Sequence, residues 1–187
     1  MSTANPFEAS IDEIEHELQI RACRTSYLEY VKYTNPGYKE SKFHNYLCRE
    51  VQKFIEKDTS AAFDILLLSV PPQFGKSTTV TETLPSYYLG KNPDKKVIIC
   101  GYNEDFAIRF GRRNREKLLE YGKEIFPKCQ LADSPCSNVE FETTAKGRCI
   151  SRGIMSGLTG NTADLFIIDD PIKNRQEADS KTTINNI

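Results

Sequence analysis

One short stretch of the chain has the residue types and the spacing needed to hold a phosphate group. Gly75, Lys76 and Ser77 follow an apolar run at residues 65–68 and precede residues expected to form a helix. In such a loop the backbone N–H groups cradle phosphate, the lysine reaches the outer phosphates and the serine hydroxyl binds Mg²⁺. The usual P-loop pattern has a further glycine where this chain has Val70, so the match is incomplete. A glycine turn before a surface helix is the alternative interpretation.

Two adjacent carboxylates, Asp169 and Asp170, end a second apolar run at residues 165–168. This pattern is typical of a Walker B strand, whose first acid holds the Mg²⁺ shell and whose second acid polarises the attacking water. An acidic turn that caps a helix beginning at Pro171 is the alternative interpretation. Because the two halves of one site occur in the expected order, each strengthens the other.

Together these patterns predict an ATP site with Mg²⁺ as its metal. We expect Lys76 to contact the β- and γ-phosphates and Asp170 to orient water, which gives both a catalytic role. Ser77 and Asp169 are the predicted Mg²⁺ ligands. We also expect Lys76→Ala to weaken Mg·ATP binding while the fold survives. The loop residues expected to contact the nucleotide are Pro72, Gln73, Phe74, Gly75, Lys76, Ser77 and Thr78.

The composition narrows the class of protein. The 187 residues can bury a sizeable core, and 25 basic against 26 acidic side chains exclude a generally cationic, nucleic-acid-binding coat. No apolar run is long enough to cross a membrane and the N-terminus lacks the layout of a signal peptide, so a cytoplasmic protein is predicted. The histidines are not spaced with cysteines as zinc ligands. Free, reduced thiols are expected at Cys23, Cys48, Cys100, Cys129, Cys136 and Cys149.

Periodicity predicts helices before the phosphate-binding loop. A capping box at Ser10 should begin the first helix after a loose tail at residues 1–9, and helical character continues to residue 33. A second helix is expected at about residues 41–57, with apolar side chains three and four residues apart that would pack on a sheet. Residues 1–62 are therefore predicted to be a helical segment that packs on the core.

The remaining residues, 63–187, are predicted to be the core, a mostly parallel α/β sheet flanked by helices. The helix after Ser77 should run through Leu84, with Pro85 kinking or ending its first part, and Asn103 should cap the next helix. A glycine-spaced loop leads into the last strand. The expected strands are residues 65–68, 97–100, 139–143, 148–154 and 165–168.

Three motifs together resemble the large terminase subunit of tailed bacteriophages and prophages. They are residues 70–77 (Val-Pro-Pro-Gln-Phe-Gly-Lys-Ser), 157–160 (Gly-Leu-Thr-Gly) and 167–173 (Ile-Ile-Asp-Asp-Pro-Ile-Lys), and further similarity lies at residues 24–28 and 92–96. The resemblance implies a P-loop ATPase of the additional-strand class that drives packaging of double-stranded DNA into procapsids. It also implies a ring of subunits, a portal protein and a small terminase subunit as partners in the cytoplasm of a bacterial host.

The chain departs from the family pattern in two places. Many members have an arginine where this chain has Gln73. In the family a coupling motif and a nuclease domain follow the Walker B strand, whereas this chain ends soon after Asp170. Because the coupling strand lies between the P-loop strand and the Walker B strand in that ATPase class, we expect a gap in the sheet and marginal stability. We also expect ATP binding without measurable turnover by this chain alone.

The glutamine at position 73 leaves the charge that develops on the γ-phosphate without an arginine. A basic cluster on the helix after Asn103 could supply one, and Arg112 or Arg113 is the preferred candidate, acting on the nucleotide of a neighbouring subunit. The alternative for this cluster is a solvated helix face, which is the usual role of such runs.

Two other functions remain open. One is a different P-loop motor such as a helicase, which would normally have Asp-Glu at Walker B and would leave the motif at residues 157–160 unexplained. The other is a truncated module that binds nucleotide, or only partner proteins, without turnover. A comparison of ATP hydrolysis with ATP binding would distinguish it from an ATPase.

Overall fold

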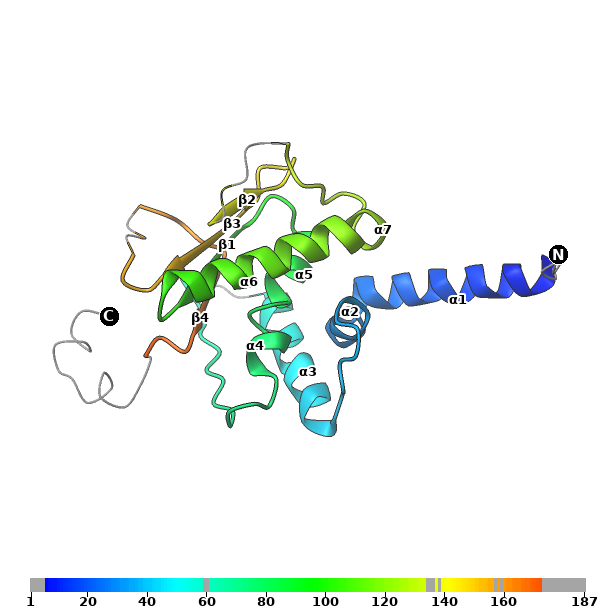
Figure 1. Cartoon of the computed structure of the whole chain (residues 1–187), viewed down its shortest axis with the longest axis horizontal. Helices are drawn as coiled ribbons and strands as arrows, with labels where there is room; N and C mark the ends of the chain where they lie inside the picture. Colours follow the sequence, from blue (N-terminus) through cyan, green and yellow to red (C-terminus); the bar gives the residue numbers. More distant parts are fainter. Residues whose placement is uncertain are drawn as a thin grey trace. The chain divides into compact units, whose positions relative to one another are not determined.

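The computed structural model describes residues 6–58, 61–133, 137, 139–156, 158 and 160–172. The chain forms two compact units, Met1–Leu67 and Leu68–Ile187, whose elements are labelled in Figure 1. Within the described residues, no helix is both long enough and apolar enough to cross a membrane. Gly157, Thr159 and Lys173 of the family motifs lie outside the described part of the chain.

Three helices form the first unit, and serine side chains cap two of them. Ser26 precedes the second helix and Ser41 the third, and each hydroxyl accepts a hydrogen bond from a backbone N–H in the first turn. Figure 1 shows these helices in blue and cyan as α1 (Pro6–Thr25), α2 (Tyr27–Thr34) and α3 (Lys42–Glu56). Both predicted helical regions are confirmed, with a break at Ser26 that the periodicity does not reveal.

The predicted start of the first helix is wrong by about one turn. The helix begins at Pro6 rather than at Ser10, because the fixed φ of proline suits the first helical position. The apolar face that the capping box should introduce stays about half exposed at Ile11, Ile14 and Leu18. The core of this unit instead buries Ile20 and Cys23 of α1, Tyr27, Tyr30 and Val31 of α2, and Leu47, Cys48 and Val51 of α3.

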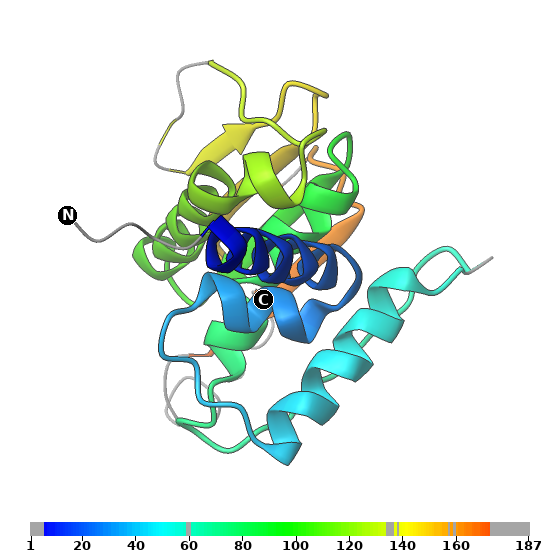
Figure 2. The same cartoon turned by 90° about the vertical axis from the view of Figure 1, so that its right-hand side faces the viewer.

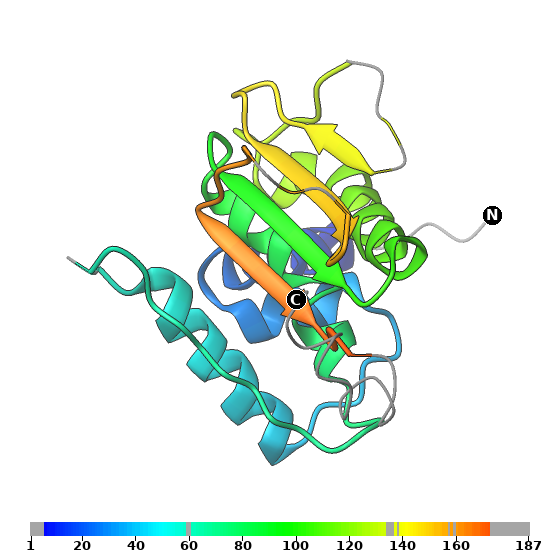
Figure 3. The ribbon, with the colours of Figure 1, turned by 90° about the vertical axis from the view of Figure 1, so that its left-hand side faces the viewer.

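A four-stranded mixed sheet is the centre of the second unit. Its strand order is β2-β3-β1-β4, with β3, β1 and β4 parallel and β2 antiparallel to β3. The register aligns Gly101 with both Gly153 and Asp169, so the three parallel strands end at one edge of the sheet (Figure 3). The strand bounds are β1 (Lys96–Gly101), β2 (Glu140–Glu142), β3 (Arg148–Gly153) and β4 (Leu165–Asp169). The predicted α/β class is confirmed.

Helices cover one face of this sheet. This face is turned away from the viewer in Figure 3 and toward the viewer in Figure 2. Helix α6 packs on β3 and β1, and α5 contacts β1. On the other face Leu158 packs on Ile98, Cys100 and Ile150, while two side chains of β4 stay about half exposed. The covering elements are α5 (Leu84–Lys91), α6 (Glu104–Lys117), the π-helical η1 (Leu118–Gly122) and α7 (Lys123–Ile125).

Four of the five predicted strands are present, and the predicted strand at residues 65–68 is wrong. This segment is described but belongs to no helix or strand, and Ile65 and Leu67 are 79% and 88% exposed. An apolar run becomes a strand only when its N–H and C=O groups find a neighbouring strand. Among the described residues β4 pairs on one side only, with β1, so this run has no ladder partner.

The helix predicted from Ser77 through Leu84 is also wrong, because it is two short helices. The first, α4 (Lys76–Thr79), ends where the Thr83 hydroxyl donates to the Thr78 carbonyl at 2.8 Å. Threonine and serine side chains compete in this way with helical hydrogen bonding. The second helix, α5, begins at Leu84, and Pro85 lies in its first turn, where its missing N–H costs no hydrogen bond.

A buried asparagine holds the turn between α4 and α5. Asn114 of α6 is 0% exposed. Its side-chain nitrogen donates to the carbonyls of Thr81 at 2.8 Å and Phe110 at 2.9 Å, and its oxygen accepts from the Ser86 N–H at 2.9 Å. The chain that leaves the predicted phosphate-binding loop is therefore fastened to the helix that covers the sheet.

Replacing Asn114 by alanine is expected to lower the free energy of unfolding by about 2–4 kcal/mol. The Ser86 N–H and the Thr81 carbonyl would lose their partner, and each buried polar group left without one costs about 1–3 kcal/mol. Urea unfolding measures the change. The matched control, Arg113→Ala, removes an exposed side chain from the same helix and should change stability by less than about 0.5 kcal/mol. An equally small loss in Asn114→Ala would show that the turn does not depend on this side chain.

The cysteines of the described residues form no disulfide bonds. The described cysteines, Cys23, Cys48, Cys100, Cys129 and Cys149, are all free and buried, as predicted, and Cys136 lies outside the described residues. Burial raises the pKa of Cys100 and Cys129 to about 11. A thiol with so high a pKa is protonated at neutral pH and is a poor nucleophile, so these cysteines serve as core side chains.

Candidate functional site

The predicted phosphate-binding loop has a backbone that leaves donors free. Gln73 and Gly75 have φ of 66° and 72°, in the left-handed region, and Gly75 caps α4. Helical bonding begins only at the Thr79 N–H, which donates to the Gly75 carbonyl at 2.8 Å. The backbone N–H groups of Lys76 and Ser77 donate no hydrogen bond within the described residues. Such first-turn donors are the groups that bind anions at a helix start.

The two carboxylates lie at the edge where the parallel strands end. Asp169 is the last residue of β4, beside Gly101 of β1, and its side chain is only 5% exposed. Asp170 leaves the strand with φ of 44°, and its side chain is 70% exposed. The peptide thus turns between them, and the two acids have different surroundings although they are adjacent in sequence.

Lys76 joins the loop to both acids. Its Nζ lies 2.9 Å from Oδ1 of Asp169 and 2.5 Å from Oδ1 of Asp170. Partial burial disfavours the charge on this amine, but hydrogen bonds to Asp170 and Asp169 favour it more, so the pKa of Lys76 is raised. Lys76 therefore stays an ammonium ion, which is the form that binds phosphate as a point charge. The structure brings together three of the predicted site residues, although Lys76 and Asp170 are 94 positions apart in the chain.

The other predicted metal ligand lies one residue further along the loop. Ser77 is half-buried in the first turn of α4, and its hydroxyl makes no hydrogen bond within the described residues. Mg²⁺ keeps several water ligands and takes only one or two side chains from a protein, so a hydroxyl and a carboxylate fit it chemically. Among the described residues no cluster of three or more histidine, cysteine or acidic side chains could hold a metal.

The predicted arginines lie away from Lys76. The Arg113 side chain is 60% exposed and lies 3.7 Å from Glu116 on the same helix. Arg112 lines a cavity of about 230 Å³ between α6 and the strands β2 and β3, with Arg115 as a second cation. Within the described part of the chain, neither Arg112 nor Arg113 has a contact with Lys76 or the two acids, so a role at the nucleotide of this same subunit has no structural support.

One cluster of polar side chains at the same edge of the sheet was not predicted from the sequence. Glu104, the first residue of α6, accepts hydrogen bonds from Arg152 at 3.2 Å and from the Ser156 hydroxyl at 3.0 Å. These contacts fasten the start of the glycine-spaced loop to α6, close to Gly153. The acidic helix start is visible in the sequence, but its partners follow only from the register of β3 beside β1.

The comparison with protein families identifies the family. A family model described as the N-terminal part of the terminase large subunit, T4likevirus-type, matches residues 67–187, which include the loop, both acids and the arginine cluster. Searches of curated proteins and of solved structures give no match.

Proposed function

The chain belongs to the family of large terminase subunits, as part of their N-terminal region, and from this premise we propose that its second unit binds Mg·ATP and, alone, hydrolyses it too slowly for a steady-state assay to detect. The family gives the chain a role in the packaging of phage DNA. The observation that carries the proposal is the contact of Lys76 with both Asp169 and Asp170 beside a loop with free N–H groups. An ammonium, two carboxylates and free backbone donors at the end of a parallel sheet are the parts that phosphoryl transfer needs.

Each group has a separate task in the proposed reaction. Lys76 binds the β- and γ-phosphates, while the loop residues 73–78 cradle them through backbone N–H groups. Ser77 and the buried Asp169 would hold Mg²⁺, which neutralises the phosphate charge when it is bound. Asp170, exposed and turned away from the strand, orients and polarises the water that attacks the γ-phosphate. The ammonium must leave at least one carboxylate to reach the phosphates, so nucleotide binding would rearrange the ion pairs of Lys76.

A further part of the proposal concerns a neighbouring subunit. Gln73 cannot supply charge, and Arg112 and Arg113 are both exposed on α6. We therefore propose that one of these arginines acts on the nucleotide of the next subunit in a ring. Double-stranded DNA, a portal protein and a small terminase subunit are the proposed partners of that assembly, in the cytoplasm of the host.

Titration of the chain with a fluorescent ATP analogue tests the ATP site. Saturable binding is expected in Mg²⁺, and removal of the metal with a chelator should weaken it because the phosphate charge is then unscreened. Asp169→Asn should reduce this dependence on Mg²⁺, whereas the control Asp94→Asn, in a surface turn, should keep it. Absence of saturable binding, or an unchanged metal dependence in Asp169→Asn, would contradict the proposed site.

A further inference from the structure

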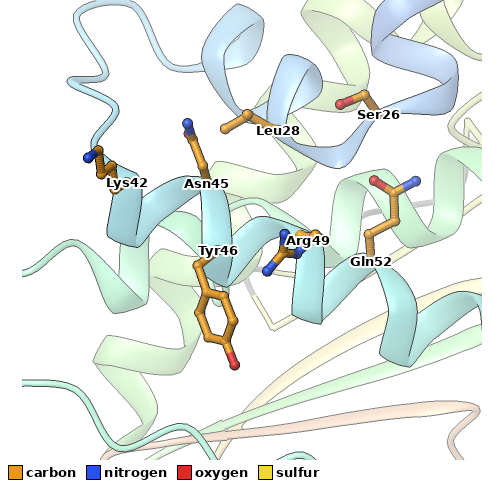
Figure 4. A pocket seen from close by; sticks show the side chains of 7 residues that line it. All are labelled: Ser26, Leu28, Lys42, Asn45, Tyr46, Arg49 and Gln52. Carbon is orange, nitrogen blue, oxygen red and sulfur yellow. The ribbon is translucent and has the colours of Figure 1, made fainter.

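A second cavity lies wholly within the first unit. It has a volume of about 610 Å³ and is formed between α2 and α3. Figure 4 shows that the side chains around it project mainly from α3, with two from the start of α2. The residues that line it are Ser26, Leu28, Lys42, Asn45, Tyr46, Arg49 and Gln52.

The polar side chains that line this cavity are cationic or neutral. Two of its side chains are cations and none is a carboxylate, and four others are a hydroxyl, a phenol and two amides. Lysine, arginine, serine, asparagine, glutamine and tyrosine are the side chains that contact phosphate oxygens in protein–DNA complexes. Leu28 is the one lining residue outside this set. The cavity therefore offers donors and positive charge to an anionic backbone.

Some of these side chains are already used to build the cavity wall. The Gln52 oxygen accepts from the Tyr27 N–H at 2.9 Å, and its nitrogen donates to the Thr25 carbonyl at 2.7 Å. The Ser26 hydroxyl accepts from the Glu29 N–H and caps α2. These bonds fasten α3 to the break between α1 and α2. They make the wall a fixed structure from which the remaining side chains project.

The other polar side chains are available to a ligand. The side chains of Lys42 and Asn45 make no hydrogen bond or ion pair within the described residues. Tyr46 is 56% exposed, which is high for an aromatic side chain, and Arg49 lies over its ring at 5.3 Å. Arg49 also lies 3.4 Å from Glu50, but that carboxylate is shared with Lys53 at 3.0 Å. Both cations of the cavity therefore keep charge that no described residue of this unit neutralises fully.

The spacing of the cations fits a phosphate backbone. Lys42, Tyr46 and Arg49 are separated by four and three residues, so they form one stripe along α3. Seven helical residues span about 10 Å, whereas successive phosphates of one DNA strand advance by about 3.4 Å along the duplex. The two cations would therefore contact different phosphates of the same strand.

We propose that the cavity between α2 and α3 is a contact site for the sugar–phosphate backbone of double-stranded DNA. Lys42 and Arg49 neutralise two phosphates, and Asn45 and Tyr46 donate hydrogen bonds to them. The contact would be independent of sequence, since the two cations and the neighbouring donors would bind phosphates and not base edges. The proposal does not depend on ATP binding, because no residue of the second unit takes part.

The salt dependence of binding to a labelled, mixed-sequence DNA duplex tests this site. Each neutralised phosphate contributes about 0.9 to the slope of log affinity against log salt. The double variant Lys42→Ala/Arg49→Ala should therefore bind more weakly, with a slope smaller by about two. Between about 50 and 200 mM salt the wild type should lose about 12-fold more affinity than this variant, because a fourfold change in salt then acts on two fewer contacts. Fluorescence anisotropy gives both quantities.

The control is a variant with the same loss of charge elsewhere in the unit. Arg21→Ala/Lys57→Ala removes two exposed cations that are already paired with Glu17 and Asp64, and its slope should stay at the wild-type value. Lys91→Ala, which removes a cation from the second unit, should also leave DNA binding unchanged. The proposal is overturned if the wild type does not bind the duplex, if the two double variants change the slope equally, or if inorganic phosphate at constant ionic strength displaces the DNA.

Discussion

Lys76→Ala is expected to weaken Mg·ATP binding by about 10- to 100-fold. Hydrogen bonds to charged groups contribute about 1.5–3 kcal/mol, and Lys76 is the charged side chain of the loop. Titration with a fluorescent ATP analogue measures the change. Lys91→Ala, which removes an amine at the end of α5, is the matched control and should bind like the wild type. Equal affinity in the Lys76 variant and the wild type would remove the loop from the proposed site.

The same substitution should lower stability, and the structure shows why. Asp169 is nearly buried, and Lys76 is its ion-pair partner in the described residues. Breaking such a pair leaves a carboxylate without compensation, which costs more than the pair itself contributes. The expectation from sequence alone, that Lys76 is not a structural contact, is therefore too simple. The double variant Lys76→Ala/Asp169→Asn removes the stranded charge, so its thermal midpoint should lie above that of Lys76→Ala, while its ATP affinity stays low.

The core of the site could be predicted from the sequence because its parts are local. A turn before a helix is indicated by Gly75, Lys76 and Ser77, and an apolar strand ends at Asp169 and Asp170. Parallel strands end at one edge of a sheet, so the order of the motifs along the chain already implies their approach. What the sequence does not contain is the direct ion pairing of Lys76 with both acids. That contact depends on the backbone turn at Asp170, where φ is positive.

These two errors share a physical cause, which is that hydrogen-bond partners, present or absent, decide whether a segment forms its helix or strand. Residues 65–68 have the composition of a buried strand, but a strand exists only with a neighbour, and composition does not name one. The helix after Ser77 ends early because Thr83 bonds to the Thr78 carbonyl and Asn114, thirty-one positions beyond Thr83, holds the turn that follows. The spacing of apolar residues carries no information about these side-chain hydrogen bonds, so neither contact could be predicted from it.

Asp170→Asn is expected to keep ATP binding and to slow hydrolysis by about 10²- to 10⁴-fold, the range for loss of a positioned general base. The amide keeps the shape of the side chain but cannot polarise the attacking water. Binding should survive because Asp170 is 70% exposed and pairs with Lys76, so its replacement frees the ammonium for phosphate. Asp169→Asn should instead act through the metal. The two neighbouring acids thus have different expected phenotypes.

Single-turnover hydrolysis of radiolabelled ATP, with protein in excess, detects rates too slow for a steady-state assay. Binding is measured in parallel, so that a loss of rate is not mistaken for a loss of affinity. Asp133→Asn, an exposed acid away from the edge of the sheet, serves as the matched control. If the wild type binds ATP and does not hydrolyse it, the chain on its own is a nucleotide-binding module. If Asp170→Asn hydrolyses ATP at the wild-type rate, this carboxylate is not the group that activates water, and its pairing with Lys76 has only a structural role.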